Sequence, residues 1–293
     1  MPPPEPRLGM HVSIAGGMDK MAERARVFGC EAVQIFSRSP QGGKARALTP
    51  HELHSARQTL VGAGIAPVVV HVPYFANLCA ADDGLRAYAV ETVAGELERA
   101  ALLGSPYVVT HLGWPAAGAG VEAGLGLVEA SVRAVFDRAG QGAGDVMLLL
   151  ENTAGAGREL GSSLEELAEV RGRLEMRCAG RVGVCLDTCH AHSAGYDLSG
   201  PQGVSAFVGL ATALLGASGI RVIHANDAVG PVGEHKDRHA PVGQGAIGEA
   251  GFRALLSAPG LRECPFILET PGSDEERAEN LARLKHIRAG EPL

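Results

Sequence analysis

Short apolar runs alternate with longer amphipathic stretches along the whole chain. Apolar runs of this length predict β-strands that are buried on both faces, and the amphipathic stretches predict helices. The predicted strands cover residues 9–13, 32–36, 67–71, 107–111, 146–151, 182–187, 221–224 and 265–269. The predicted helices include residues 83–103, 121–139, 164–171, 252–257 and 274–288.

Continuous apolar strands that alternate with helices are typical of an α/β protein with a closed parallel barrel. An open doubly wound sheet is the alternative, but no G-x-G-x-x-G motif follows an early strand, so its dinucleotide-binding form has no support. No repeat, linker or low-complexity segment divides the chain. The sequence therefore predicts a single-domain (β/α)8 TIM barrel over residues 8–293, after a flexible proline-rich segment at residues 1–7.

The composition, with 46% hydrophobic and 20% charged residues, is that of a soluble globular enzyme. No run of about 18 apolar residues could cross a bilayer, and the N-terminus lacks the apolar stretch of a secretory signal. The six cysteines have no disulfide-framework spacing, so we expect reduced thiols. These features predict a cytoplasmic protein without a membrane partner, and we expect a monomer. The formal charge of −7 argues against a general nucleic-acid binder, which would normally be basic.

Six consecutive predicted strands finish with a residue that can bind a metal ion. These residues are His71, His111, Glu151, Asp187, His224 and Glu269. A single histidine or aspartate at a strand end more often caps a loop, but the C-terminal ends of barrel strands share one rim, where active sites lie. Burying so many such groups together without a partner would cost several kcal/mol for each group. Divalent cations at this rim would supply the compensating charge.

Three more candidate ligands lie in loops beyond these strands. His190 follows Asp187 by three residues, and Asp237 and His239 lie in the group KDRH. The D-x-H spacing places both side chains on the same side of an extended segment. The nine candidates, five histidines and four carboxylates, suit zinc, manganese or iron in a catalytic role. The two cysteines of VCLDTCH could bind zinc in principle, but packing is the favoured interpretation because no second cysteine pair exists.

Several longer segments resemble bacterial endonuclease IV, the apurinic/apyrimidinic endonuclease family 2. The segments are HVSIAGG, ENTAGAG, VGVCLDTCHAHSAGYD, HANDA, DRHAPVGQGAIG and ILET. The similarity runs from about residue 8 to about residue 287, which is nearly the whole chain. Motifs that are this long, numerous and ordered identify the chain as a member of the family.

The resemblance implies three zinc ions at the rim, with manganese or iron possible in part of the cluster. It divides the nine ligands into one group for each ion: His71, His111 and Glu151; Glu151, Asp187, His224 and Glu269; and His190, Asp237 and His239. Glu151 would bridge the first two ions. Three divalent ions would offset most of the formal charge of −7, so an acidic chain could still present a face that attracts phosphate.

The resemblance also implies the activity of a deoxyribonuclease IV (phage-T4-induced type), a hydrolase of phosphoric ester bonds. Such an enzyme acts in base excision repair on double-stranded DNA that contains abasic sites or blocked 3′ ends. It cuts 5′ to the abasic site, leaves a 3′-hydroxyl and a 5′-deoxyribose phosphate, and trims blocked 3′ ends. Glu269 would orient or deprotonate the attacking water, and Glu151 could share that role.

Seven further residues are candidates for contacts with DNA: Tyr74, Phe75, Arg38, Gln41, Lys44, Lys236 and Arg238. The two aromatic residues directly follow a ligand-bearing strand and resemble a pair that family members wedge into the base stack. The basic residues suit backbone phosphates. The loop at residues 37–46 departs from the best-known members, because two glycines stand where those members carry bulkier side chains.

Two other functions compete with DNA cleavage. A two-metal sugar isomerase or epimerase on the same barrel would also place carboxylates and histidines at strand ends, but it has no need of His190, Asp237 and His239. A protein that binds damaged DNA without cutting it should have lost at least one ligand, and all nine are present. Both alternatives are therefore disfavoured.

Overall fold

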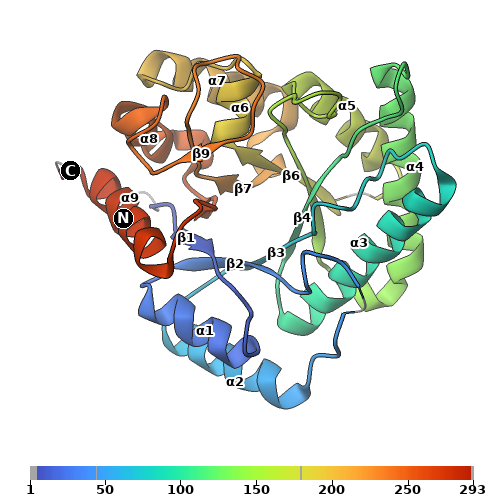
Figure 1. Ribbon diagram of the computed structural model, residues 1–293, viewed down its shortest axis with the longest axis horizontal. Coiled ribbons are helices and arrows are strands. Elements are labelled where there is room, and N and C mark those ends of the chain that lie inside the picture. The colour runs from blue at the N-terminus through green and yellow to red at the C-terminus, as the bar shows by residue number, and fades with distance from the viewer. Residues whose placement is uncertain (1–4, 44, 179, 292–293) are drawn as a thin grey trace.

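Eight strands form the centre of the molecule. They are β1 (Leu8–His11), β2 (Ala32–Phe36), β3 (Val68–His71), β4 (Tyr107–His111), β5 (Met147–Glu151), β6 (Val182–Asp187), β7 (Ile220–His224) and β10 (Phe266–Leu268). In this computed structural model, which describes residues 5–43, 45–178 and 180–291, they close into a barrel in the order β1-β10-β7-β6-β5-β4-β3-β2 (Figure 1). All neighbouring strands are parallel, so the predicted TIM barrel is confirmed.

Helices surround the barrel and connect successive strands (Figure 1). They are α1 (Met18–Val27), α2 (Pro50–Gly62), α3 (Asp83–Leu103), α4 (Val121–Ala139), α5 (Leu164–Glu175), α6 (Thr188–Ala194), α7 (Pro201–Leu215), α8 (Gly248–Ser257) and α9 (Asp274–Ala289). Side-chain caps define the first residue of several of these helices. Ser163 accepts a hydrogen bond from the backbone N–H of Glu166 at the start of α5, and Ser273 forms a capping box with Glu276 at the start of α9.

The predicted boundaries agree closely with the observed ones. Residues 32–36, 107–111 and 182–187 coincide with β2, β4 and β6, and residues 83–103 and 121–139 coincide with α3 and α4. The other strands differ by one or two residues at an end, and the helices by up to four. The prediction did not include the short antiparallel pair β8 (Asp227–Ala228) and β9 (His239–Ala240), which lies outside the barrel.

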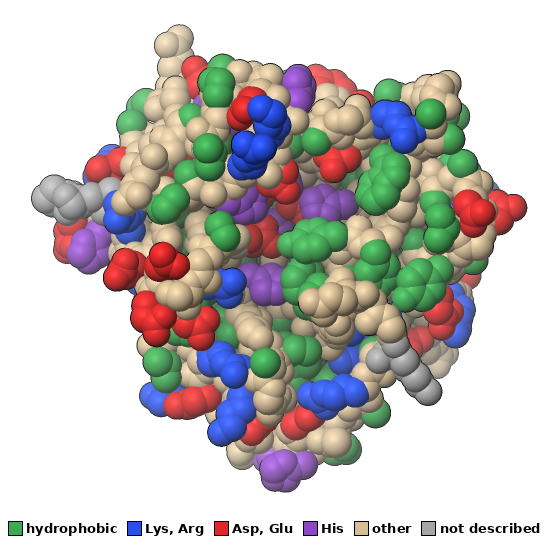
Figure 2. Space-filling model, viewed as in Figure 1, with side chains coloured by type: hydrophobic (Ala, Val, Ile, Leu, Met, Phe, Trp, Pro, Cys, Tyr) green, Lys and Arg blue, Asp and Glu red, His purple; other side chains and the backbone are tan. Residues whose placement is uncertain are grey.

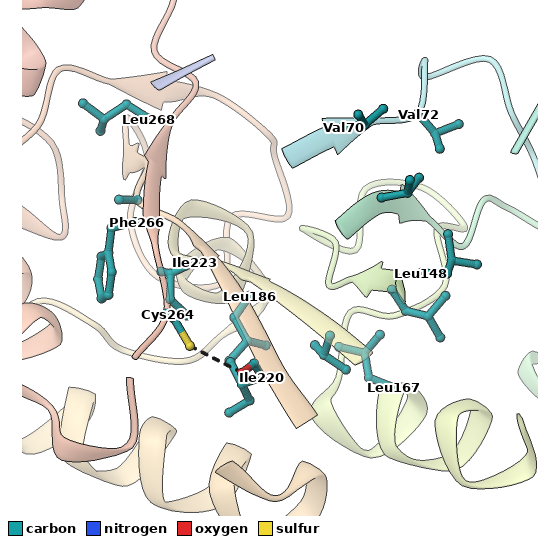
Figure 3. Packing of buried hydrophobic residues seen from close by; sticks show 14 of the residues in the cluster. Val70, Val72, Leu148, Leu167, Leu186, Ile220, Ile223, Cys264, Phe266 and Leu268 are labelled. Carbon is teal, nitrogen blue, oxygen red and sulfur yellow. Dashed lines mark hydrogen bonds between the residues drawn. The ribbon is translucent and has the colours of Figure 1, made fainter. Parts of the chain in front are cut away.

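The core has two apolar layers, one on each face of the sheet. Inside the barrel, seven strands each contribute one buried residue: Ala32, Val69, Val109, Leu149, Cys185, Val222 and Ile267. The alternate strand residues, such as Leu148 and Leu186, pack in the larger cluster that includes helix residues such as Leu167 of α5 (Figure 3). Because side chains alternate between the two faces of a strand, the inner layer fixes which later residue of each strand also points inward.

The end of the barrel at the strand N-termini is closed by polar contacts. Arg288 of α9 donates to both carboxylate oxygens of Glu31, at 2.6 and 2.7 Å, and to the backbone oxygen of Pro6 at 2.8 Å. Arg7 donates to the backbone oxygen of Gly64 at 2.8 Å. Residues 5–7 of the predicted flexible segment therefore lie against the barrel, whereas residues 1–4 lie outside the described residues. Among the helices described, none is both long and apolar enough to cross a membrane.

Candidate metal centre

A polar layer lies directly above the inner apolar layer of the barrel. It consists of the residues two positions after the apolar ones, Gln34, His71, His111, Glu151, Asp187, His224 and Glu269. Two positions along a strand return the side chain to the same face, so all of these side chains converge on the barrel axis. In the space-filling view, histidine and acidic side chains form the floor of a hollow in the middle of this face (Figure 2). The six predicted strand-end ligands are thus brought together.

Glu151 lies at the centre of this layer. Its Oε1 is 2.7 Å from His224 Nδ1 and 3.6 Å from His190 Nδ1. Its Oε2 is 3.1 Å from His71 Nε2 and 3.4 Å from His111 Nε2. One buried carboxylate therefore faces four imidazoles from four different elements, the arrangement expected of a bridging ligand.

Backbone carbonyl oxygens orient two of these imidazoles, those of His71 and His190. His71 Nδ1 lies 2.7 Å from the backbone oxygen of Val72, which leaves Nε2 to face Glu151. His190 Nδ1 lies 2.9 Å from the backbone oxygen of Asn152. A ring that donates one N–H to a carbonyl presents the lone pair of its other nitrogen, and metal-binding histidines are commonly oriented in this way.

The three loop candidates join the same centre. Asp237 Oδ1 is 3.3 Å from His190 Nε2 and 3.0 Å from His239 Nε2. His239 lies in β9, which pairs with β8, and its Nδ1 is 3.3 Å from the backbone oxygen of Glu269. Its Nε2 is buried without a hydrogen-bond partner among the described residues, although a carboxylate oxygen lies close. A nitrogen and an oxygen that lie side by side without a hydrogen bond suit a shared cation.

The donor atoms form groups that could each hold a metal ion, with all donor atoms of a group within 4.8 Å of one another. The groups are His71, Glu151 and His224; Glu151, Asp187, His224 and Glu269; Asp187, His190 and His239; and Cys189, Asp237 and His239. The second group is identical to one predicted set. His111 falls outside these groups but faces the same Glu151 oxygen as His71, and Asp187 is shared between two groups.

The electrostatics of the centre favour bound cations. Burial raises the pKa of Glu151, but the charges of His224 and His111 hold it well below its usual range. Burial lowers the pKa of His239, whereas the nearby carboxylates of Asp237 and Asp187 raise it to about 9. The carboxylates thus draw positive charge into a buried site, and divalent cations supply such charge. The residues present fit a metal cluster.

The Cys189 thiol is a poor candidate ligand despite its position. Its Sγ donates a hydrogen bond to the backbone oxygen of Arg238 at 3.5 Å, and burial raises the pKa of the Cys189 thiol above its usual range. Metal binding requires the thiolate. The carboxylates and imidazoles are therefore better candidate ligands than this thiol.

Three buried amides that were not predicted support the ligands. Gln34 donates to Glu269 Oε1 at 2.7 Å and lies 2.8 Å from His224 Nε2. Asn226 donates to Asp187 Oδ2 at 2.6 Å and to Glu269 Oε2 at 3.1 Å. Asn152 accepts a hydrogen bond from the backbone N–H of Asp187 at 2.7 Å. The motifs ENTAGAG and HANDA contain two of these amides, and that signal could have identified them.

The two aromatic candidates for DNA contact differ in their surroundings. Tyr74 is 61% exposed beside the centre. Phe75 stacks on Tyr88 of α3, with ring centroids 5.6 Å apart and an interplanar angle of 24°. Tyr74 is therefore free to contact a ligand, whereas Phe75 is held in a packed pair.

The polar candidates for DNA contact also differ in their surroundings. Arg38 Nε donates to buried Glu96 at 2.6 Å, and Lys236 forms an ion pair with Glu234. Gln41 and Arg238 are exposed. Lys44 lies outside the described residues.

A pocket of about 240 Å³ opens beside the candidate ligands. Tyr74 and Trp114 contribute aromatic side chains to its wall, and His111, His190 and Asp237 are the candidate ligands that line it. Trp114 is 44% exposed. A small group bound in this pocket would lie against both aromatic rings and the metal ligands.

Comparisons with known proteins identify the family. Residues 22–288 match the family model described as xylose isomerase-like TIM barrel. The chain is 44% identical over 282 residues to a probable endonuclease 4 of Methanoculleus marisnigri, covering 96% of this chain and 98% of that protein. The crystal structure of endonuclease IV from Thermus thermophilus has 37% identity and a TM-score of 0.85, with 97% of this chain and 100% of that chain covered. A D-tagatose 3-epimerase-like protein shares the fold, with 22% identity, a TM-score of 0.72 and 96% of each chain covered. At this identity and coverage, the chain belongs to the endonuclease IV family.

Proposed function

We propose that this protein is a metal-dependent repair endonuclease that hydrolyses the phosphodiester bond 5′ to abasic sites in double-stranded DNA. The products would be a 3′-hydroxyl and a 5′-deoxyribose phosphate, and blocked 3′ ends would also be trimmed. The observation that carries the proposal is the convergence of nine imidazole and carboxylate donors at one rim. Relatives named probable endonuclease 4 over nearly the whole chain support it.

Three zinc ions are the proposed cofactors, with manganese or iron as substitutes in part of the cluster. Divalent ions in such a site polarise a phosphoryl oxygen and lower the pKa of water, which provides a nucleophile near neutral pH. The proposed ligands are the nine residues His71, His111, Glu151, Asp187, His190, His224, Asp237, His239 and Glu269.

Glu269 is proposed to orient the attacking water and to accept its proton. Gln34 and Asn226 each donate to one of its carboxylate oxygens, so its position is fixed from two sides. Burial raises the pKa of Glu269, but the charge of His224 brings it down to about 2. The group is therefore ionised at neutral pH and able to accept a hydrogen bond from water. Glu151, which faces four imidazoles, would act mainly as a bridging ligand.

A sugar isomerase or epimerase is the second candidate function. The similarity to an epimerase-like protein concerns the fold and does not extend to the reaction. His190, Asp237 and His239 favour the nuclease, because a two-metal reaction on a sugar leaves these three donors unused. These three residues could hold a further cation, and cleavage of a phosphodiester would benefit from it because negative charge develops on the leaving oxygen.

The proposed function can be tested with a duplex oligonucleotide that contains one tetrahydrofuran abasic analogue. The analogue blocks lyase chemistry, so only hydrolysis 5′ to the site cuts it. Metal content is measured on the same sample. Cleavage to a 3′-hydroxyl by protein with about three bound metals supports the proposal. Fully metallated protein that leaves the duplex intact, and instead converts free or phosphorylated sugars, would overturn it.

Tyr74 and Phe75 should respond differently to substitution. Tyr74→Ala should raise the KM for abasic DNA about tenfold, because one exposed aromatic surface for stacking is lost. Phe75→Ala should instead lower the free energy of unfolding by about 2 kcal/mol, since its ring packs on Tyr88. DNA binding can be followed by fluorescence of Trp114, the single tryptophan, which lines the same pocket as Tyr74. Equal effects of both substitutions on KM and on stability would contradict this division.

A further inference from the structure

A second, smaller pocket shares Tyr74 with the first. It has a volume of about 140 Å³ and is lined in part by His11, Phe36, Glu269 and Arg277. Tyr74 lines both pockets, and its ring lies 5.5 Å from that of Phe36 in an edge-to-face contact. Both hollows therefore include candidate metal ligands, and they share one exposed tyrosine.

Arg277 brings a positive charge to this second pocket. It lies in the first turn of α9, and its Nε is buried without a hydrogen-bond partner among the described residues. Arg38 and Arg288, by comparison, hold a carboxylate at 2.6 Å. A buried guanidinium N–H without an acceptor is costly, so an acceptor supplied by a ligand would relieve that cost.

Arg221 is the other described arginine with a buried, unpartnered Nε, but its position is different. It lines a pocket with Tyr107, the first residue of β4. That pocket lies at the strand N-termini and includes none of the candidate ligands. Arg277, in contrast, shares its pocket with Glu269. Of these two guanidinium groups, Arg277 is the one placed to act on a molecule at the metal centre.

We propose that Arg277 binds a backbone phosphate of the cleaved DNA strand, next to the phosphate that is hydrolysed. This inference rests on the proposed nuclease function. Glu269 and Arg277 line the same pocket, so a strand whose phosphate is hydrolysed at Glu269 can place a neighbouring phosphate at Arg277. A guanidinium matches the oxygens of a phosphate with two parallel hydrogen bonds. The pocket walls contributed by Phe36, Tyr74 and Leu268 are poor partners for base edges, so the contact reads charge and not sequence.

The test combines a protein substitution with a substrate substitution. Arg277→Gln should raise the KM for the abasic duplex about tenfold with little change in kcat, and it should lower the salt dependence of binding by about one counterion. Methylphosphonates, which remove the charge of one phosphate, are then placed singly at the positions on either side of the cleaved bond. At one of these positions the neutral group should raise the KM of the wild-type protein about tenfold. The KM of Arg277→Gln should not change with the same substrate.

Arg262→Gln is the matched control. It removes the same charge from the pocket at the strand N-termini, and its KM, salt dependence and sensitivity to methylphosphonates should equal those of the wild type. If Arg277→Gln is too unstable to assay, Arg277→Lys keeps the charge but loses the paired hydrogen bonds, and should show a smaller rise in KM. Wild-type cleavage with identical methylphosphonate sensitivity in wild type and Arg277 variants overturns this inference alone. A wild type that does not cut the abasic duplex overturns the proposed function itself.

Discussion

Replacing Glu151 with glutamine should lower the rate of cleavage at an abasic analogue by about 1000-fold or more and reduce the bound metal below that of the wild type. Loss of an outer partner of a metal ligand already costs about 10–100-fold, and Glu151 faces four imidazoles directly. Glutamine keeps the shape of the side chain but removes the negative charge and one acceptor oxygen. A neutral amide cannot bridge two cations, so the centre should lose metal as well as activity. Single-turnover cleavage and metal analysis of the same preparation measure both effects.

Two further variants make the Glu151→Gln result specific. Glu31→Gln makes the same chemical change in the ion pair with Arg288, at the far end of the barrel, and should keep both metal content and rate while lowering stability slightly. Glu269→Gln should lower kcat by about 100-fold or more, with a smaller loss of metal, because Glu269 is proposed to act on the water. If Glu151→Gln keeps full metal content and activity, Glu151 is not a ligand of the centre. The proposed metal cluster would then be wrong.

Polar residues at the ends of apolar runs made most of this candidate site predictable. His71, His111 and Glu151 each end a strand, and each stands two positions after a residue of the inner apolar layer. Apolar runs that end in a polar residue are visible in the sequence, so the ligands could be found without coordinates.

Gln34 was not predicted to belong to the site because it does not end its strand. β2 continues to Phe36, and Phe36 pairs in register with His71. Strands in a barrel are staggered relative to its axis, so the residue that reaches the polar layer is the last of some strands and an earlier one of others. The stagger depends on how the strands pair, and a single sequence does not reveal it.

The loop that carries His239 could not be predicted for a different reason. Its strands, β8 and β9, have only two residues each, which is too short for any pattern of apolar positions. Asp227 organises the loop through hydrogen bonds from backbone N–H groups up to 21 residues further along the chain. Backbone donors have no sequence signature, so only the HANDA motif pointed to this residue.

Asp227→Asn should lower the free energy of unfolding by about 2–4 kcal/mol and reduce occupancy of the group that contains His239. The buried Asp227 carboxylate accepts backbone N–H groups from Ala228 at 2.8 Å, from Gly243 and Gly245 at 2.9 Å, and from Ile247 at 3.0 Å. Asparagine has nearly the same shape, but one of its two ends is an N–H donor, which would face backbone N–H groups without an acceptor. Urea unfolding of the metal-free protein and metal content of the loaded protein measure the two effects.

The matched control for Asp227→Asn is Asp197→Asn, which makes the same change at an exposed aspartate whose side chain, among the residues described, accepts hydrogen bonds from Ser199 alone. It should cost less than about 1 kcal/mol and leave metal content unchanged. The comparison separates the loss of one charge from the loss of an internal acceptor for a whole loop. If Asp227→Asn is as stable as Asp197→Asn and binds as much metal, the loop is held by its packing, and Asp227 has no part in placing His239 beside Asp187 and Asp237.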